Sequence, residues 1–230
     1  MIARMGLLTR RPDCTNEQFR NHWRNVHGPL AAKLPHLRAY EQNHIVRSVQ
    51  VANCPIPEAL VFDGVSKLWF DDYEAMKLAV ASNEYSEVAA DELNFMLPSK
   101  VVSVEQWQLC ARSTVRRLKK CLKCISLLTR TSSQPIQDFQ TRLRSSLDGV
   151  TSKHPGIVGC TQNIVIGRSQ AGRHLGYNDL QIDSVIEFWF EGADVLHHFL
   201  SPETTTRASW NIHEFTMKRS TWVVDVHAIV

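Results

Sequence analysis

His27 is the residue of this chain best suited to chemistry, because it is a titratable side chain on the apolar face of a predicted helix. The helix is expected over residues 16–33, and its apolar stripe consists of Phe19, Trp23, Val26, His27, Leu30 and Leu34. Imidazole titrates close to neutral pH, so His27 could act as a general acid or base. The alternative is a buried, hydrogen-bonded histidine of the core, and the sequence leaves both open.

A second group of polar side chains lies on the strand predicted over residues 38–48. Tyr40, Gln42 and His44 alternate along it and therefore point to one face of the sheet. Tyr40 or His44 could orient or protonate an oxygen of a ligand, so His27, Tyr40 and His44 are the candidate catalytic residues. A solvated strand end or a paired interface would hold the same residues without a catalytic role.

Four residues are candidates for substrate binding. Trp23 shares the helix face of the candidate histidine, and Gln42 lies between the two candidate residues of the strand. Lys67 and Trp69 share one face of a further strand, which is expected over residues 60–70.

The elements that must position these residues occur twice, at a constant offset of 120 residues. The tetrapeptide Leu-Leu-Thr-Arg at residues 7–10 recurs at 127–130, and the Trp-Phe pair at 69–70 recurs at 189–190. Phe19 and Asp63 also recur in register, as Phe139 and Asp183. Several registered matches without a gap indicate two diverged copies of one unit.

Each copy has the element order β-α-β-β-α-β of a ferredoxin-like unit. The expected elements lie at 2–10, 16–33, 38–48, 60–70, 72–96 and 100–109, and at 121–130, 135–150, 157–167, 181–190, 192–216 and 219–229. We assign residues 1–110 and 121–230 to the two units and residues 111–120 to a linker. Two helices cover only one face of each sheet, so the other faces must meet. The predicted fold class is α+β, with two tandem ferredoxin-like units that form a pseudo-dimeric α+β barrel within one chain.

The first copy resembles a known family. Residues 19–30 read Phe-Arg-Asn-His-Trp-Arg-Asn-Val-His-Gly-Pro-Leu, which is similar to the F-x-x-x-W-x-x-x-H-G-P-L signature of the EthD-like family. The strand at residues 63–71 resembles the second landmark of that family. This resemblance covers most of residues 1–108, and it implies a dimeric α+β barrel that takes small cyclic or aromatic ligands. The second copy lacks the signature and reads Leu-Asp-Gly-Val at residues 147–150.

Comparison of the two copies also predicts that they are unequal in function. The residues equivalent to His27, Tyr40 and His44 are Leu147, Cys160 and Ile164. We therefore expect any active pocket in the first copy. Lys67 and Glu187 are equivalent and oppositely charged, so they are hypothesised to pair across the pseudo-twofold axis.

The leading functional hypothesis is a cofactor-independent isomerase or lyase that acts on a small cyclic or aromatic-derived compound, with His27 as general acid or base. One alternative is a protein that binds a small ligand without converting it. Another is a haem-handling barrel with His27 as axial ligand, or a cofactor-free monooxygenase. The expected partner is a small molecule, and a homodimer of pseudo-dimers is left open.

Bulk properties argue against other classes. A net charge of +3 and a pI of about 8.6 are too mild for a nucleic-acid binder. No apolar run approaches a bilayer span, and the N-terminus lacks the core of a signal peptide, which predicts a cytoplasmic protein. Cys121 and Cys124 form a lone C-x-x-C without partner ligands, so no metal site is expected, and no cofactor is expected either.

Overall fold

The computed structural model describes residues 1–49, 61–110, 121–201, 212 and 215–230. The first repeat contains β1 (Ile2–Leu8), α1 (Asn16–His22), the π-helical turn η1 (Trp23–His27), α2 (Gly28–Ala31), β2 (Ala39–Val49), β3 (Gly64–Phe70), α3 (Tyr73–Val80), α4 (Asn83–Phe95) and β4 (Lys100–Cys110). The second contains β5 (Leu122–Arg130), α5 (Ile136–Lys153), β6 (Ile157–Gln170), β7 (Arg173–His174), β8 (Ser184–Phe190), α6 (Ala193–Leu200) and β9 (Thr216–Ala228). The predicted linker lies outside the described residues.

The strands form one closed antiparallel barrel. Their order is β4-β1-β3-β2-β9-β5-β8-β6-β7, and β4 also pairs with β6. Each repeat contributes a ferredoxin-like sheet, and each sheet joins the other through its edge strands, β2 with β9 and β4 with β6. Both repeats thereby lose their open edges. The predicted pseudo-dimeric barrel is confirmed.

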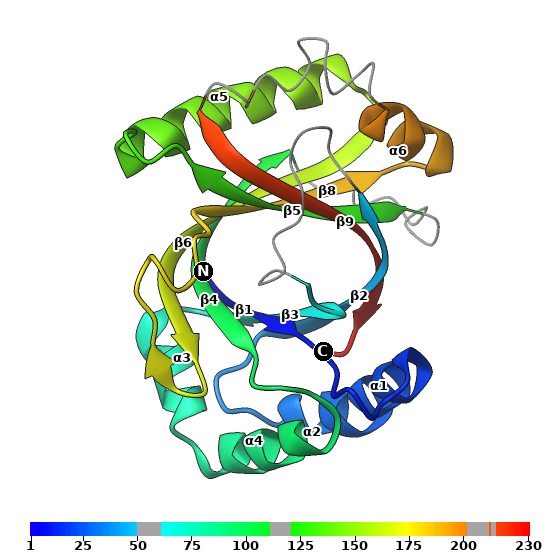
Figure 1. Cartoon of the computed structure of the whole chain (residues 1–230), viewed down its shortest axis with the longest axis vertical. Coiled ribbons are helices and arrows are strands. Elements are labelled where there is room, and N and C mark those ends of the chain that lie inside the picture. Colours follow the sequence, from blue (N-terminus) through cyan, green and yellow to red (C-terminus); the bar gives the residue numbers. More distant parts are fainter. Residues whose placement is uncertain (50–60, 111–120, 202–211, 213–214) are drawn as a thin grey trace.

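The helices lie outside the barrel in two layers (Figure 1). Helices α1, α2 and α4 cover one end, and α5 and α6 cover the other. Side chains alternate along each strand, so Met5 and Leu7 pack inside the barrel with Val65 and Trp222, whereas Leu8 packs under the helices. None of the helices in the described ranges is both long and apolar enough to cross a membrane.

The barrel interior also contains a buried charge cluster. Lys67 pairs with Glu187, which confirms the hypothesis drawn from their equivalent positions. Lys123 contacts Glu187 at 2.6 Å and pairs with Glu41 as well. Lys67 and Trp69 therefore point into the barrel, away from the helical layer that holds His27. Their assignment to substrate binding stays a prediction.

The first helix differs from its prediction at η1. Pro29 has no N–H, and in an uninterrupted α-helix its ring would meet the carbonyl group of Asn25. The chain instead forms a π-helical turn in which the Gly28 N–H donates to the Trp23 carbonyl. This wider turn rotates Val26 out of the predicted apolar stripe, so its side chain is 45% exposed.

Candidate active site

A small polar cavity lies between the first helix and the sheet of the first repeat. Its polar lining residues are Arg4, His27, Tyr40, Ser66, Tyr85, Glu92 and Ser99, and all except Ser99 come from the five elements β1, η1, β2, β3 and α4. The cavity volume is about 20 Å³, which is room for about one water molecule. The structure thus brings two of the three predicted catalytic residues, His27 and Tyr40, to one cavity.

His27 is held by a carboxylate from the opposite helix. Its Nδ1 lies 3.0 Å from Oδ2 of Asp91 on α4, and Asp91 also accepts from His22 at 2.9 Å. Because Nδ1 points to the carboxylate, we assign the proton to Nδ1, which leaves the Nε2 lone pair available to act as a base. Burial lowers the pKa of His27 more than the hydrogen bond to Asp91 raises it, so the imidazole is neutral at neutral pH.

Tyr40 is prepared to donate a proton. Its hydroxyl oxygen accepts from Trp23 Nε1 at 2.9 Å and from Gln42 Nε2 at 3.2 Å. Among the described residues no acceptor is found for the hydroxyl proton, which is therefore free to bind an oxygen in the cavity. Burial raises the pKa of Tyr40, which keeps the phenol protonated. Trp23 and Gln42 act here on Tyr40, and their predicted role as direct substrate ligands stays a prediction.

His44 lies apart from this cavity. Its Nε2 is 3.1 Å from Gln42 Oε1, its ring packs on Trp23, and it is not among the residues that line the cavity. Burial, followed by the neighbouring His227, lowers the pKa of His44 to about 3. The geometry therefore separates His44 from His27 and Tyr40, and its catalytic assignment stays a prediction.

Trp23 fits beneath the strand because position 64 is glycine. A Cβ atom on Gly64 would lie 2.3 Å from Cζ3 of Trp23. The equivalent pair in the second repeat is Leu143 with Ser184, where a smaller hydrophobe faces a larger strand residue. The indole that holds Tyr40 therefore depends on a glycine that the first repeat alone retains.

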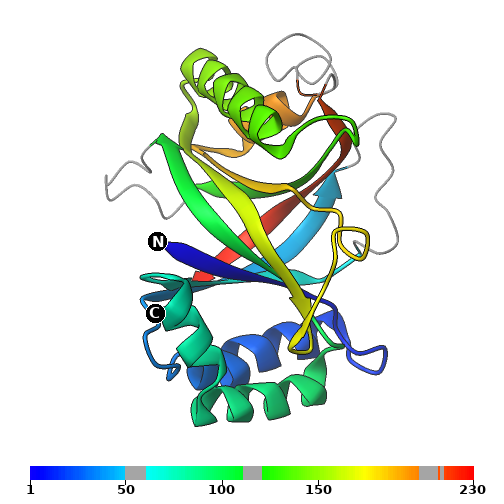
Figure 2. The ribbon, with the colours of Figure 1, turned by 90° about the vertical axis from the view of Figure 1, so that its left-hand side faces the viewer.

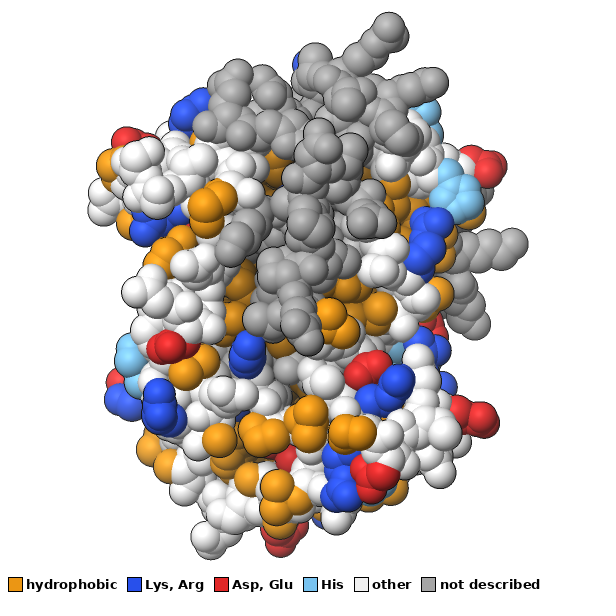
Figure 3. All heavy atoms as spheres, in the orientation of Figure 1, with side chains coloured by type: hydrophobic (Ala, Val, Ile, Leu, Met, Phe, Trp, Pro, Cys, Tyr) orange, Lys and Arg blue, Asp and Glu red, His pale blue; other side chains and the backbone are white. Residues whose placement is uncertain are grey.

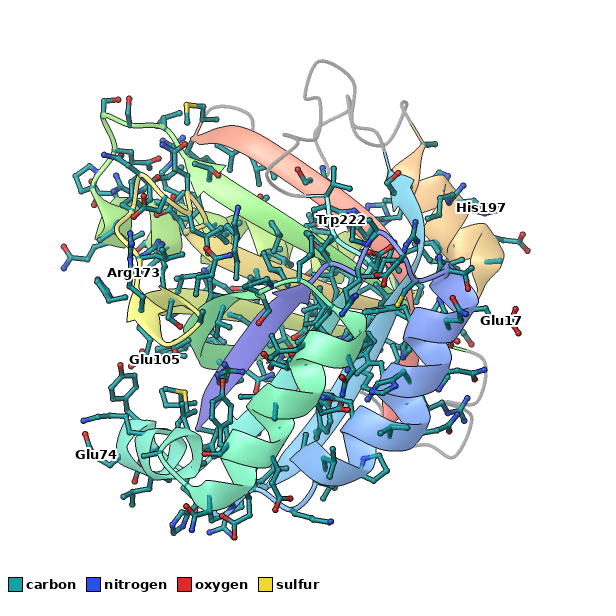
Figure 4. All side chains as sticks on the ribbon, turned by 60° about the horizontal axis from the view of Figure 1, so that its bottom comes forward. Glu17, Glu74, Glu105, Arg173, His197 and Trp222 are labelled. Atoms are coloured by element: carbon teal, nitrogen blue, oxygen red, sulfur yellow. The ribbon has the colours of Figure 1, made fainter. Side chains whose placement is uncertain are left out.

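The cavity borders a much larger cleft of about 780 Å³. Both spaces are lined by Arg4, Tyr85, Glu92, Met96 and Ser99, which form the partition between them. One wall of the cleft is α3 and α4, and the other is the β6–β7 hairpin of the second repeat. Figure 2 shows β6 extending across the barrel to the helical layer of the first repeat. In Figure 4, Glu74 on α3 and Arg173 on β7 lie on the same side of the molecule.

The surface above the helical layer is mixed in character. On the face shown in Figure 3, hydrophobic side chains gather over the lower half, with charged side chains beside them. Leu93 and Leu97, both exposed, also line the cleft. The cleft therefore offers exposed apolar side chains to a ligand.

The second repeat supplies an internal comparison for the polar cavity. The positions equivalent to Arg4, His27, Tyr40, Ser66 and Glu92 hold Cys124, Leu147, Cys160, Ile186 and Ile212. All five of these belong to one buried apolar cluster. The fold therefore closes this space with hydrophobic side chains where no polar site is kept, and the polar residues of the first repeat are not required by the architecture.

The sequence prediction missed Asp91, Arg4, Tyr85 and Glu92. Asp91 had a usable signal, because it falls between Val88 and Phe95 at the spacing of one helical face. An acidic residue on a buried stripe of a helix is as unusual as the histidine that led to His27. The contact between His27 and Asp91 could not be foreseen, because the two residues lie 64 positions apart in sequence and on different helices.

Residues 11–99 match the family model of the EthD domain. The first repeat is an EthD domain. No curated protein matches the chain. The chain is similar in fold to an anthrone oxidase-like protein, with a TM-score of 0.62 and 8% identity over 99% of this chain and 93% of that one. It is also similar in fold to a dye-decolorizing peroxidase from Bacteroides thetaiotaomicron, with a TM-score of 0.54 and 4% identity over 97% of this chain and 92% of that one.

A protein of Lactobacillus acidophilus, provisionally described as a monooxygenase, gives a TM-score of 0.57 and 12% identity over 99% of this chain and 94% of that one. The TM-scores show that the EthD domain and its partner repeat share the barrel fold with these proteins, and the identities are too low to show more than the fold. Haem ligation by His27 is one of the alternatives predicted from the sequence. The closed cavity of about 20 Å³ beside His27 has room for neither a macrocycle nor a substrate ring, so any such ligand has to approach from the adjoining cleft, and haem ligation by His27 stays a prediction. In the described ranges no cluster of His, Cys, Asp and Glu side chains is arranged to hold a metal ion.

Proposed function

We propose that the EthD domain is a cofactor-independent isomerase or lyase that moves a proton on a small cyclic carbonyl compound. The observation that carries the proposal is the pairing of His27 and Tyr40 in a polar cavity whose equivalent in the second repeat is packed with hydrophobic side chains. Buried polar groups are costly to retain without a function, so their confinement to one repeat supports a working site.

The arrangement supports a defined first step. His27 Nε2 takes a proton from the carbon next to the carbonyl group: the C–H bond breaks, an N–H bond forms, and the electron pair moves to the carbonyl oxygen. Tyr40 donates a hydrogen bond to that oxygen, where negative charge develops. Return of the proton to another carbon gives an isomerase, and loss of a group from the β carbon gives a lyase. Asp91 orients the imidazole and stabilises its charged form.

Deuterium exchange tests this step without knowledge of the later ones. A panel of cyclic ketones and lactones is incubated with the protein in D2O, and deuterium incorporation is followed by mass spectrometry. The two test variants are His27→Leu and His44→Ile, because each introduces the residue that the second repeat already holds. We expect exchange in the wild type, a loss of about 10²–10⁴-fold in His27→Leu, and near wild-type exchange in His44→Ile.

Full exchange in folded His27→Leu would contradict the proposal. A compound that binds the wild type but gains no deuterium and is recovered unchanged would favour the alternative of a non-catalytic binding protein. A compound that gains oxygen would favour the monooxygenase alternative.

A further inference from the structure

Arg4 is a cation placed where the fold does not need one. It lies in the middle of β1, between β3 and β4, on the face toward the helices. It borders both the small cavity and the large cleft. Its equivalent in the second repeat is the buried Cys124, so a small neutral side chain is sufficient for packing at this position.

The guanidinium group of Arg4 has most of its donors unused. Its Nη2 donates to the Tyr85 hydroxyl at 2.9 Å, and in the described part of the chain this is its one side-chain hydrogen bond. It forms no ion pair with any described residue, including Glu92, the carboxylate beside it in the partition. A half-buried guanidinium carries five N–H donors in a planar fork that matches a carboxylate. The guanidinium carbon lies 5.5 Å from the centre of the Tyr85 ring, and its charge also interacts with Glu92, but most of its N–H donors remain available to an anionic ligand.

The other two side chains of the cleft lining with a full positive charge are already engaged. Lys77 pairs with Glu74 at 3.0 Å. Arg168 donates to the carbonyl oxygens of Leu180 at 2.9 Å and Ile182 at 2.6 Å. Arg4 is left as the cation that can receive a ligand.

The rest of the cleft suits the body of a small organic molecule. Its volume of about 780 Å³ lies within the usual range for ligand pockets, and its surface includes Tyr73, Met76, Val80 and Val101. Apolar and aromatic side chains of this kind bury a ring, and a single charged group fixes its orientation.

We propose that the substrate is a cyclic organic acid whose carboxylate binds Arg4 and whose ring lies in the cleft between α3–α4 and the β6–β7 hairpin. This inference rests on the proposed function and names its substrate class. Binding at Arg4 displaces the Tyr85 hydroxyl, opens the partition, and points the reactive edge of the ring toward His27.

The test uses 2-naphthoate and its uncharged analogue 2-naphthamide as probes, with binding measured by isothermal titration calorimetry. We expect wild-type protein to bind the naphthoate about 10–100-fold more tightly, as a charged hydrogen bond predicts. Arg4→Gln should bind the two probes equally. Lys77→Gln is the matched control, because it removes the same charge from the same cleft, and it should keep the preference.

A second variant keeps the proposal testable if Arg4→Gln does not fold. Tyr85→Phe removes the hydroxyl that occupies Arg4 and leaves the cation, so it should bind naphthoate at least as tightly as wild type. Undetectable naphthoate binding by the wild type, an undiminished preference in Arg4→Gln, or loss of the preference in Lys77→Gln would each overturn the proposal. His27→Leu separates the two proposals, because it should lose deuterium exchange and keep the naphthoate preference.

Discussion

Lys67 and Glu187 form an ion pair inside the barrel, although they occupy the same position of the two repeats. Both side chains are fully buried, and Lys67 also donates to Asn163 Oδ1 at 3.0 Å. A barrel made of two identical units would place like charges at these positions. The pair therefore ties the two unequal repeats to one another.

Loss of Lys67 should be strongly destabilising. In Lys67→Met, Lys123 is the one cation among the described residues that still pairs with the buried carboxylates of Glu41 and Glu187. We expect the free energy of unfolding to fall by about 3–5 kcal/mol, measured by urea denaturation. Lys77→Met is the control, because its pair with Glu74 is exposed, and it should change stability by no more than about 1 kcal/mol. Equal effects of the two substitutions would refute this account.

Gly64 should not tolerate even a methyl group. In Gly64→Ala the new Cβ collides with the Trp23 ring, and we expect a loss of about 1–3 kcal/mol in unfolding free energy. Trp23→Leu in the same chain should recover part of that loss, because leucine is the residue of the second repeat. The opposite sign is expected for Gly149→Ala in α5, where nothing lies within 4 Å of the added atom and alanine should stabilise by about 0.5–1 kcal/mol.

His44 should make the protein sensitive to acid. Its folded pKa of about 3 lies below the ordinary value of 6.5, so between these values the unfolded chain binds one more proton than the folded chain. Stability should therefore fall as pH drops from 6.5 toward 3, by up to about 1.4 kcal/mol per pH unit from this residue. His44→Ile should flatten the stability profile in that window. An unchanged slope, in urea titrations at several pH values, would show that other groups govern acid unfolding.

Asp91 is expected to act through His27 as a positioning residue. In the wild type, deuterium exchange should decline in acid as His27 becomes protonated, at a pH below the ordinary histidine pKa of 6.5 because burial lowers the pKa of this residue. Asp91→Asn removes the carboxylate that raises the pKa of His27. The acid limb of the exchange profile, that is, the pH range over which exchange declines, should therefore move to lower pH. The exchange rate should also fall by about 10²–10⁴-fold, because the ring is no longer held in its reactive tautomer.

Asn94→Ala provides the comparison for Asp91. Asn94 donates to Asp91 Oδ1 at 3.3 Å but does not contact the oxygen that faces His27. It should leave the acid limb in place. A limb that stays fixed in Asp91→Asn would mean that the carboxylate serves packing alone.

The features of this molecule that could be predicted are those that follow from repeats and residue patterns along the sequence. The 120-residue offset led to the barrel and to the Lys67–Glu187 pair. The element predicted over residues 72–96 is divided into α3 and α4, because Ser82 caps the start of α4. The sequence could not predict the features that depend on contacts between elements far apart along the chain. The Asp91–His27 contact is one example, and the partition around Arg4 and Tyr85 is another.

Smaller differences have local causes. The π-helical turn before Pro29 changed the exposure of Val26, because a helical wheel assumes one constant twist. The β6–β7 hairpin was not expected, since β7 has only two residues and pairs with β6 over Ser169 and Gln170. That short hairpin nevertheless forms a wall of the cleft of about 780 Å³.

The division of the cleft walls between the two repeats has a consequence for stoichiometry. A homodimer of single units would present its sites in symmetric pairs, and occupancy of one could influence the other. In the described part of this chain, the polar cavity with its cleft occurs once, because the second repeat supplies a hairpin to the site and fills its own equivalent space with hydrophobic side chains. Titration should therefore saturate at one ligand per 26.2-kDa chain, along a simple hyperbola without cooperativity.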